Sequence, residues 1–194
     1  LTFPTSTKPN RVEWTQINVG ALSFSPFSLR GQYVQHDGDA WGVSIGFPLL
    51  TRAEAAPFQA FAGKLQGRRG TFLAGDTLLA SPRGTIAGTV QIRANTVGQF
   101  LLQVKGMTAG STLKEGDLLQ VGNSLYQVLE DKTADGSGNA DFEVWPRCRG
   151  HAANTSVVYS NPKCLLRLTS QVIQAIGADE SQLYSVSFQA EEAL

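Results

Sequence analysis

The segment from Leu113 to Pro146, LKEGDLLQVGNSLYQVLEDKTADGSGNADFEVWP, constrains the fold of this chain most strongly. Residues 117–121 and 125–130 are apolar-rich runs with partial alternation, which is typical of strands. Gly122-Asn123 lies between them, and this pair can take the positive φ angles of a tight hairpin turn. The sequence therefore predicts a β-hairpin here.

A third strand completes this unit. Residues 134–138, ADGSG, predict a looser turn, and Ala140–Trp145 predicts a strand that ends before Pro146, which cannot donate to a β-ladder. Three short strands joined by two turns predict a small, curled antiparallel barrel. Modules of this kind bind and pack, and they catalyse only where a site has been added to them.

Composition narrows the class of protein. The chain has 194 residues, enough for one large or two small domains, and 42% are apolar. Only 16% are charged, below the usual quarter, so the surface is expected to be rich in small polar residues or to be covered by other subunits. Sixteen basic and sixteen acidic residues cancel, which argues against a dedicated nucleic-acid binder.

Segments for membranes and secretion are not expected. No apolar run approaches the roughly 20 residues that cross a bilayer, and the start lacks the basic and apolar regions of a signal peptide. The chain begins with Leu1 rather than Met. We expect a cytosolic compartment with reduced thiols, in which Cys148 and Cys164 are small buried or half-buried residues; whether they pair is left open.

The first third of the chain predicts strands. Residues 12–19 fit a strand with a local irregularity, and residues 23–30, SFSPFSLR, alternate aromatic with small polar side chains. Strands are also expected at Gly31–Gln35 and at residues 41–47, with residues 36–39, HDGD, as the turn between them. We expect a meander with one aromatic face.

Residues 50–66 change to a helical period. Thr51 and Glu54 form a capping-box pattern, and Gly67 is placed to stop the helix. Pro57 deletes a hydrogen bond, so a kink or a restart is expected there. Apolar residues at spacings of three and four predict the buried face: Phe58, Phe61 and Leu65.

The loop and strand signals in the rest of the chain predict two domains. Residues 74–87 are polar and irregular and mark a crossing, and residues 88–163 are predicted to form the inserted barrel. Residues 164–169 and 183–190 predict strands that close the first sheet, with a strand and a turn between them at 170–182. The first domain is thus residues 1–87 together with 164–194.

Residues with catalytic or metal-binding chemistry are few. Cys148 and His151 lie three residues apart, but with Cys164 and the distant His36 they form no recognisable zinc spacing. Asp37 and Asp39 are explained as turn residues. No phosphate-binding loop or nucleophile motif occurs. The sequence therefore predicts no catalytic residue, no metal ligand and no cofactor.

Three further aspartates and an asparagine could suggest a calcium loop, but they lack the EF-hand spacing and its terminal Glu; they are Asp131, Asp135, Asn139 and Asp141. Arg68, Arg69 and Arg83 lie around the predicted helix exit. The default interpretation is a solvated surface, and the alternative is an inter-subunit salt bridge or a lining that meets a passing polyanion. Three arginines alone do not establish nucleic-acid binding.

Four segments in order resemble a known family. RVEW, then LLTRAEAAPFQAFAGKLQGRRGTFLAGD, then the 113–146 segment, then NPKCLLRL are together similar to the distal-tail or minor tail proteins of long-tailed bacteriophages and prophages. The resemblance covers most of the chain, from about Arg11 to Ala190. It implies a mainly β fold: a tail-tube-like β-sandwich or split barrel with one flanking α-helix and an inserted small β-barrel of the OB or SH3 kind.

The resemblance also implies a structural function. Such proteins form a six-membered ring at the end of the tail tube, and the ring joins the tube to the hub and the receptor-binding or fibre proteins. The implied partners are further copies of the chain, these tail proteins and, transiently, the phage DNA that passes through the lumen. The implied location is the virion tail tip, assembled in the cytoplasm of the bacterial host.

We expect the ring interface to involve the strands around Trp14 and Trp41 together with the N-terminal arm through Asn10. Arg68, Arg69 and Arg83 are candidates for lumen or inter-subunit contacts. The insert at 88–163 is expected to project outward and dock peripheral proteins. A head-to-tail contact of this kind closes a ring by rotation.

Two other functions are compatible with the sequence. The first is a carbohydrate-binding or adhesion module, in which Trp145 and Tyr126 stack on sugar. The second is an enzyme that uses Cys148 and His151. Glycan binding by a monomer would indicate the first, and loss of activity in a Cys148→Ser variant would indicate the second.

Overall fold

The computed structural model describes residues 1–76, 79–94, 96–170 and 183–194. Its helical elements are α1 (Arg52–Leu65) and the short 3₁₀ helix η1 (Gly67–Arg69). The strands are β1 (Arg11–Ile17), β2 (Gly20–Phe24), β3 (Gly31–Gln35), β4 (Ala40–Gly46), β5 (Thr71–Ala74), β6 (Gly88–Ala94), β7 (Leu101–Met107), β8 (Thr112–Leu113), β9 (Leu118–Val121), β10 (Ser124–Val128), β11 (Lys132–Thr133), β12 (Ala140–Trp145), β13 (Val157–Val158), β14 (Cys164–Leu168) and β15 (Ser187–Glu192). The prediction of a mainly β chain is confirmed.

The first sheet draws on both ends of the chain. Its order is β1-β4-β15-β14-β5, and all four pairings are antiparallel. Buried and half-buried residues alternate along β4, so that Trp41, Val43 and Ile45 face the core. As predicted, the last strands complete this sheet, although β15 begins at Ser187, later than expected. The strand predicted within 170–182 lies almost wholly outside the described residues.

Helix α1 covers this sheet with its apolar face. Phe58, Phe61 and Leu65 are buried, as their spacing predicts. Glu54 accepts hydrogen bonds from the backbone N–H and the hydroxyl of Thr51, which confirms the capping box. The helix continues through Pro57 without the predicted restart, because the proline lies on the exposed face, where water can satisfy the carbonyl that loses its donor.

The inserted segment forms a second, nearly closed sheet with the order β13-β9-β10-β12-β7-β6. A bridge between Gln91 of the edge strand β6 and Ser156, which directly precedes the other edge strand β13, brings the two edges together. The predicted hairpin is present: Ser124 pairs with Val121, and Gly122 has a φ of 59°. A core of its own fills this barrel. The looser turn at 134–138 is also confirmed, because Asp135 and Asn139 are hydrogen-bonded across it.

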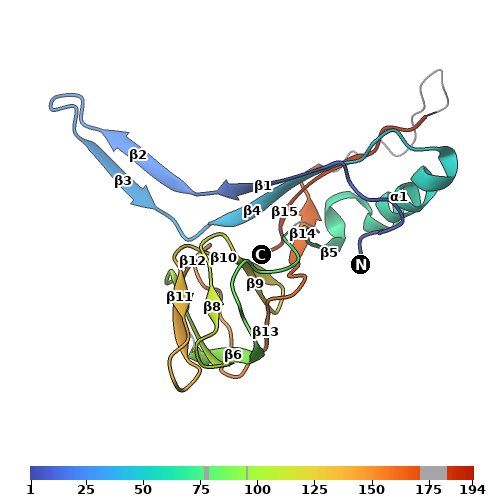
Figure 1. Ribbon diagram of the computed structural model, residues 1–194. Helices are drawn as coiled ribbons and strands as arrows, with labels where there is room; N and C mark the ends of the chain where they lie inside the picture. The colour runs from blue at the N-terminus through green and yellow to red at the C-terminus, as the bar shows by residue number, and fades with distance from the viewer. Residues whose placement is uncertain (77–78, 95, 171–182) are drawn as a thin grey trace.

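The predicted meander is wrong, because β1–β4 form one long hairpin instead. β1 pairs with β4 and β2 pairs with β3, and the N–H of His36 donates to the carbonyl of Val19 between the two ladders. The turn predicted at residues 36–39 is absent, and residues 37–39 form a bulge opposite Asn18 instead. Bulges bend a ribbon. Figure 1 shows the ribbon bending at this point, so that β2 and β3 project from the rest of the molecule.

The two sheets share apolar contacts. Leu118, Leu125 and Trp145 of the second sheet belong to the core of the first. The N–H of Leu165 also donates to the carbonyl of Asn123 at 3.0 Å. The barrel is therefore fixed against the first sheet rather than tethered to it by linkers alone. Within the described ranges, no helix has the length and apolar character that a membrane crossing requires.

Candidate functional site

The projecting hairpin, residues 20–35, is the most unusual surface of the molecule, and we call it the hairpin arm. All ten residues of β2 and β3 are exposed. Six large apolar side chains of the arm face solvent: Leu22, Phe24, Phe27, Leu29, Tyr33 and Val34. Phe27, at the tip, is 98% exposed. Arg30 is the one charged residue of the segment. Contiguous exposed apolar surface of this kind marks an interaction site.

The register of the two strands places aromatic side chains on one face of the arm. Leu22 lies opposite Tyr33 and Phe24 lies opposite Gly31, so these side chains share one face. Tyr33 lies across Gly20, where a Cβ would be only 2.2 Å from the tyrosine oxygen. Glycine is therefore required at that position for the ring to cover the strand. The arm nevertheless buries little of itself, and a two-stranded hairpin alone is marginally stable in water.

A network of charges holds the root of the arm. Arg147, which follows β12, forms ion pairs with Asp37 and Asp39 of the bulge. Arg149 donates to the backbone carbonyl of Asp39 and lies 3.4 Å from the carboxylate of Glu192 on β15. Asp39 is fully buried. Arg147 and Arg149 of the barrel thus hold the bulge in place through these ion pairs and this hydrogen bond. We infer that they set the direction in which the arm leaves the sheet.

Glu192 is the titratable group of this network with a displaced pKa. Burial raises the pKa of its carboxyl, and the nearby guanidinium of Arg149 opposes that change. The carboxylate also accepts the backbone N–H of Trp41 at 3.3 Å. Glu192 therefore connects the barrel, β4 and β15 through one side chain.

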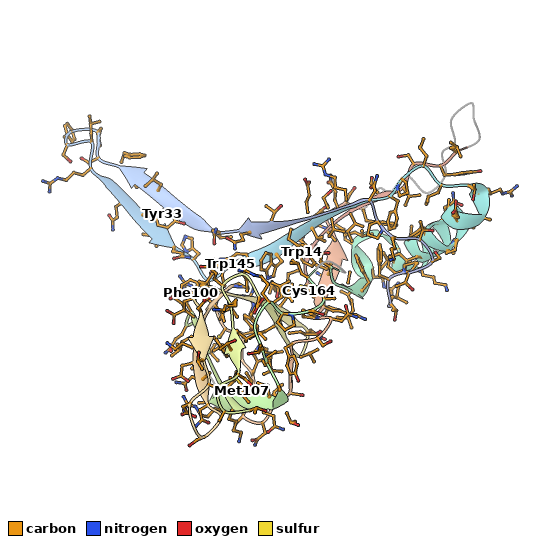
Figure 2. The ribbon with its side chains drawn as sticks, in the orientation of Figure 1. Trp14, Tyr33, Phe100, Met107, Trp145 and Cys164 are labelled. Atoms are coloured by element: carbon orange, nitrogen blue, oxygen red, sulfur yellow. The ribbon has the colours of Figure 1, made fainter. Side chains whose placement is uncertain are left out.

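Three tryptophans pack beside this network. The ring of Trp41 lies 4.5 Å from that of Trp145 and 5.8 Å from that of Trp14, both in edge-on geometry. Trp41 donates its indole N–H to the carbonyl of Leu125, and Trp145 donates to the side chain of Asn18 at 3.0 Å. Figure 2 shows Trp14 and Trp145 at the junction of sheet and barrel, with Tyr33 on the arm.

A cavity of about 220 Å³ opens beside the tryptophans. Its lining carries no charged residue and consists of Trp14, Gln16, Trp41, Leu79, Leu118, Leu125 and Gln127. The side chain of Gln16 donates to that of Gln127 at 2.9 Å. The indole N–H of Trp14 is buried and has no hydrogen-bond partner in the described part of the chain. The cavity thus has apolar walls and an uncharged polar rim.

The residues predicted for a ring interface differ in how far they are exposed on the protomer. Trp41 is only 4% exposed and lies inside the protomer, whereas Trp14 is half-buried at its edge. The N-terminal arm is anchored to its own protomer, since Thr2 bridges Leu73 and the ring of Phe3 packs among the aromatic side chains of the first core. An interface at these strands stays a prediction.

The three predicted arginines have separate partners. Arg68 forms an ion pair with Glu191 on β15 at 3.2 Å, and Arg69 donates to Gln66. Arg83 donates to the carbonyl of Glu115 in the barrel. Each of the three thus has a partner within its own chain, and their contacts with a lumen or a neighbour stay a prediction.

The thiol and imidazole candidates are half-buried or buried in the barrel. The thiol of Cys148 donates to the carbonyl of Leu101 at 3.2 Å, and burial raises its pKa, which disfavours the thiolate that a nucleophile requires. His151 lies 2.7 Å from the hydroxyl of Tyr126. Cys164 lies in the other core, and both cysteines are free thiols. No three His, Cys, Asp or Glu side chains among the described residues gather as a metal site.

Two expectations from the sequence need correction. Tyr126 is fully buried and Trp145 is 6% exposed, so neither can stack on a sugar as the adhesion alternative requires. Burial also raises the pKa of Tyr126 to about 12. Asp37 and Asp39 are not residues of a hairpin turn but the acidic half of the network at the root of the arm.

Sequence reasoning missed the arm and the charge network. The arm had a signal in the alternation of SFSPFSLR, which gives strands whose aromatic side chains have no partner strand to cover them. The network had none, because Asp39, Arg147 and Glu192 are far apart in the sequence. Comparison of the chain with protein-family models and with curated proteins gives no match.

Proposed function

We propose that this chain is a structural protein of a bacteriophage tail tip, in which identical copies form a ring of the six-membered kind that the resemblance implies. The ring would join the tail tube to the hub and receptor-binding proteins and surround part of the DNA path. Support comes from the four ordered segments that resemble distal-tail proteins and from the mainly β fold with one helix.

The observation that carries the proposal is the hairpin arm. A monomer that exposes Phe24, Phe27, Leu29 and Tyr33 on a projecting ribbon leaves apolar area in water that association would bury. The ion pairs at the root fix the arm in one direction, which favours docking on a partner of defined geometry. Assembly explains both features, whereas a small-molecule site needs neither.

The charge balance fits a surface near passing DNA. Sixteen basic and sixteen acidic residues leave the chain with no net charge, so a ring of such chains would not bind strongly to the polyanion. The further partners in the proposal are the tail tube, hub and fibre proteins, and the location is the virion after assembly in the bacterial cytoplasm. The adhesion alternative has no comparable support, since its two aromatic residues are buried.

Native mass spectrometry of the purified protein over a range of concentrations, with negative-stain imaging of any oligomer, tests the proposal. A closed ring with a central hole is expected, and its mass gives the number of subunits. A protein that remains monomeric up to its solubility limit, in the presence and absence of a purified tail tube protein, contradicts it.

A further inference from the structure

We propose that the charge network at the root of the hairpin arm is an acid-sensitive latch. At neutral pH the network holds the arm in one direction, and proton uptake beside Arg149 releases the arm to swing about Asn18 while both sheets stay folded. The inference goes beyond the proposed function, because the latch lies within one subunit and operates whether or not copies of the chain assemble.

The two strands of the arm are held at its root by different kinds of contact. Before β2, the side chain of Asn18 accepts the indole N–H of Trp145 at 3.0 Å, and neither group carries a charge. After β3, the bulge is held by charged groups, because Arg147 pairs with the carboxylate of Asp39 and Arg149 donates to the backbone carbonyl of the same residue. Loss of the charged contacts thus frees one strand and leaves the other as a pivot.

Attraction between charges, rather than paired hydrogen bonds, holds the latch closed. Arg147 lies 3.4 Å from the carboxylate of Asp39, and Arg149 lies 3.4 Å from that of Glu192. The Nε atoms of both arginines and one carboxylate oxygen of each acid are buried without a hydrogen-bond partner in the described part of the chain. All four side chains are at most 20% exposed, so salt screens their attraction little. Neutralising one charge here leaves its partner buried and uncompensated.

Proton uptake at Glu192 weakens the latch. Burial raises the pKa of this carboxyl, and the guanidinium of Arg149 opposes that change. The carboxylate also faces the backbone N–H of Trp41 on β4 and the thiol of Cys164 on β14, and neither carries a charge. Moving Arg149 away therefore raises the pKa of Glu192 further. Because linkage is reciprocal, protonation of Glu192 favours the state in which Arg149 has moved away.

His151 acts in the same direction. Burial lowers the pKa of its imidazole, and the positive charge of Arg149 lowers it further. Departure of Arg149 raises this pKa, so acid favours the released state at a second group. Burial raises the pKa of Tyr126 and of Cys148, which also lie near Arg149, so both stay neutral in acid. The ordinary pKa values of a glutamate and a histidine, 4.5 and 6.5, bracket the pH range in which the arm should be released.

Pulsed electron paramagnetic resonance between two nitroxide labels measures the direction of the arm. The labels are attached at Ser28→Cys on the exposed tip and at Val97→Cys, a 58% exposed position on the barrel. Both native thiols are buried, and labelling of the parent protein checks that they do not react. Dilution into an excess of unlabelled protein restricts the distances to single chains. We expect one narrow distance at neutral pH and a second, broader population near pH 4.5.

Three variants identify the groups that act. Arg149→Gln removes one charge of the latch and should show the released population already at neutral pH. Glu192→Gln has nearly the shape of the protonated carboxyl and should change the distances in the same direction. Arg93→Gln, which loses an exposed ion pair with Asp141 on the barrel, is the matched control and should keep the narrow distance. Thermal unfolding followed by circular dichroism shows that each protein is folded at the pH of the measurement.

The outcomes decide the inference without reference to assembly. A second population of the wild type in acid, and of Arg149→Gln or Glu192→Gln at neutral pH, supports the latch. One narrow distance in the folded wild type at both pH values overturns it, as does a broad distribution in the wild type at neutral pH. Should the wild type unfold before the arm can be measured in acid, a narrow distance in both variants at neutral pH overturns the latch as well. None of these results requires a ring, so the proposed function is decided by its own experiment.

Discussion

Trp145 should be the side chain that couples the barrel to the root of the hairpin arm. It is 6% exposed, its ring lies 4.5 Å from that of Trp41, and its indole N–H donates to Asn18 at 3.0 Å. Replacing Trp145 with Phe keeps an aromatic contact but removes this hydrogen bond and one of the two fused rings. Because Trp145 lies on the second sheet but packs in the core of the first, the change should destabilise the whole fold rather than one sheet.

The magnitude follows from these contacts. A hydrogen bond of this kind contributes about 1 kcal/mol, and the acceptor Asn18 is exposed and can bind water once its donor is lost. The smaller ring leaves a partial cavity that adds about 1–2 kcal/mol. Trp145→Phe should therefore lower the free energy of unfolding by about 2–3 kcal/mol, and Asn18→Ala by about 1 kcal/mol.

Urea denaturation followed by far-ultraviolet circular dichroism gives these free energies for the wild type, both single variants and the double variant. The hydrogen bond predicts a coupling energy of about 1 kcal/mol between the two sites. Each protein should unfold in one transition, because the sheets share a core. Additivity within about 0.3 kcal/mol, or two separate transitions in the wild type, would refute the reasoning.

Three further predictions concern single groups. The raised pKa of Glu192 means that the folded state keeps this proton to a higher pH than the unfolded chain, so its contribution to the free energy of unfolding should fall as pH rises above about 4.5. Glu192→Gln should remove that part of the pH slope in urea midpoints, and equal slopes in both proteins would contradict it. Thr51→Ala, which loses the cap of α1, should cost about 1 kcal/mol by thermal unfolding; an unchanged melting temperature would count against the capping box. Cys148 and Cys164 are buried and burial raises the pKa of both thiols, so a thiol reagent should label them only after unfolding; rapid labelling of the native protein is the opposite result.

Local signals in the sequence predicted the local structure well. The Gly122-Asn123 turn fixes the register of its hairpin, and the period of Phe58, Phe61 and Leu65 fixes the buried face of the helix. These features depend on neighbouring residues, which the sequence displays directly. The mainly β class and the inserted barrel-like sheet follow from them.

Long-range pairings were not predictable in the same way. The Asp37-Gly38-Asp39 segment has the composition of a turn, but its carboxylates pair with Arg147, which is distant in the sequence, and the chain continues in the same direction. The meander was predicted for this reason and is wrong. The cavity beside Trp14 likewise depends on how the barrel is placed on the sheet, which no local pattern specifies.

The central claim is that the hairpin arm drives self-assembly. The most direct test replaces residues 21–34 with Asn-Gly, which closes a two-residue turn between Gly20 and Gln35 and leaves the charge network at the root in place. Sedimentation velocity over a range of concentrations should show that the wild type assembles while the trimmed protein stays monomeric with unchanged unfolding. Identical assembly of the two proteins, or a monomeric wild type, would contradict the account.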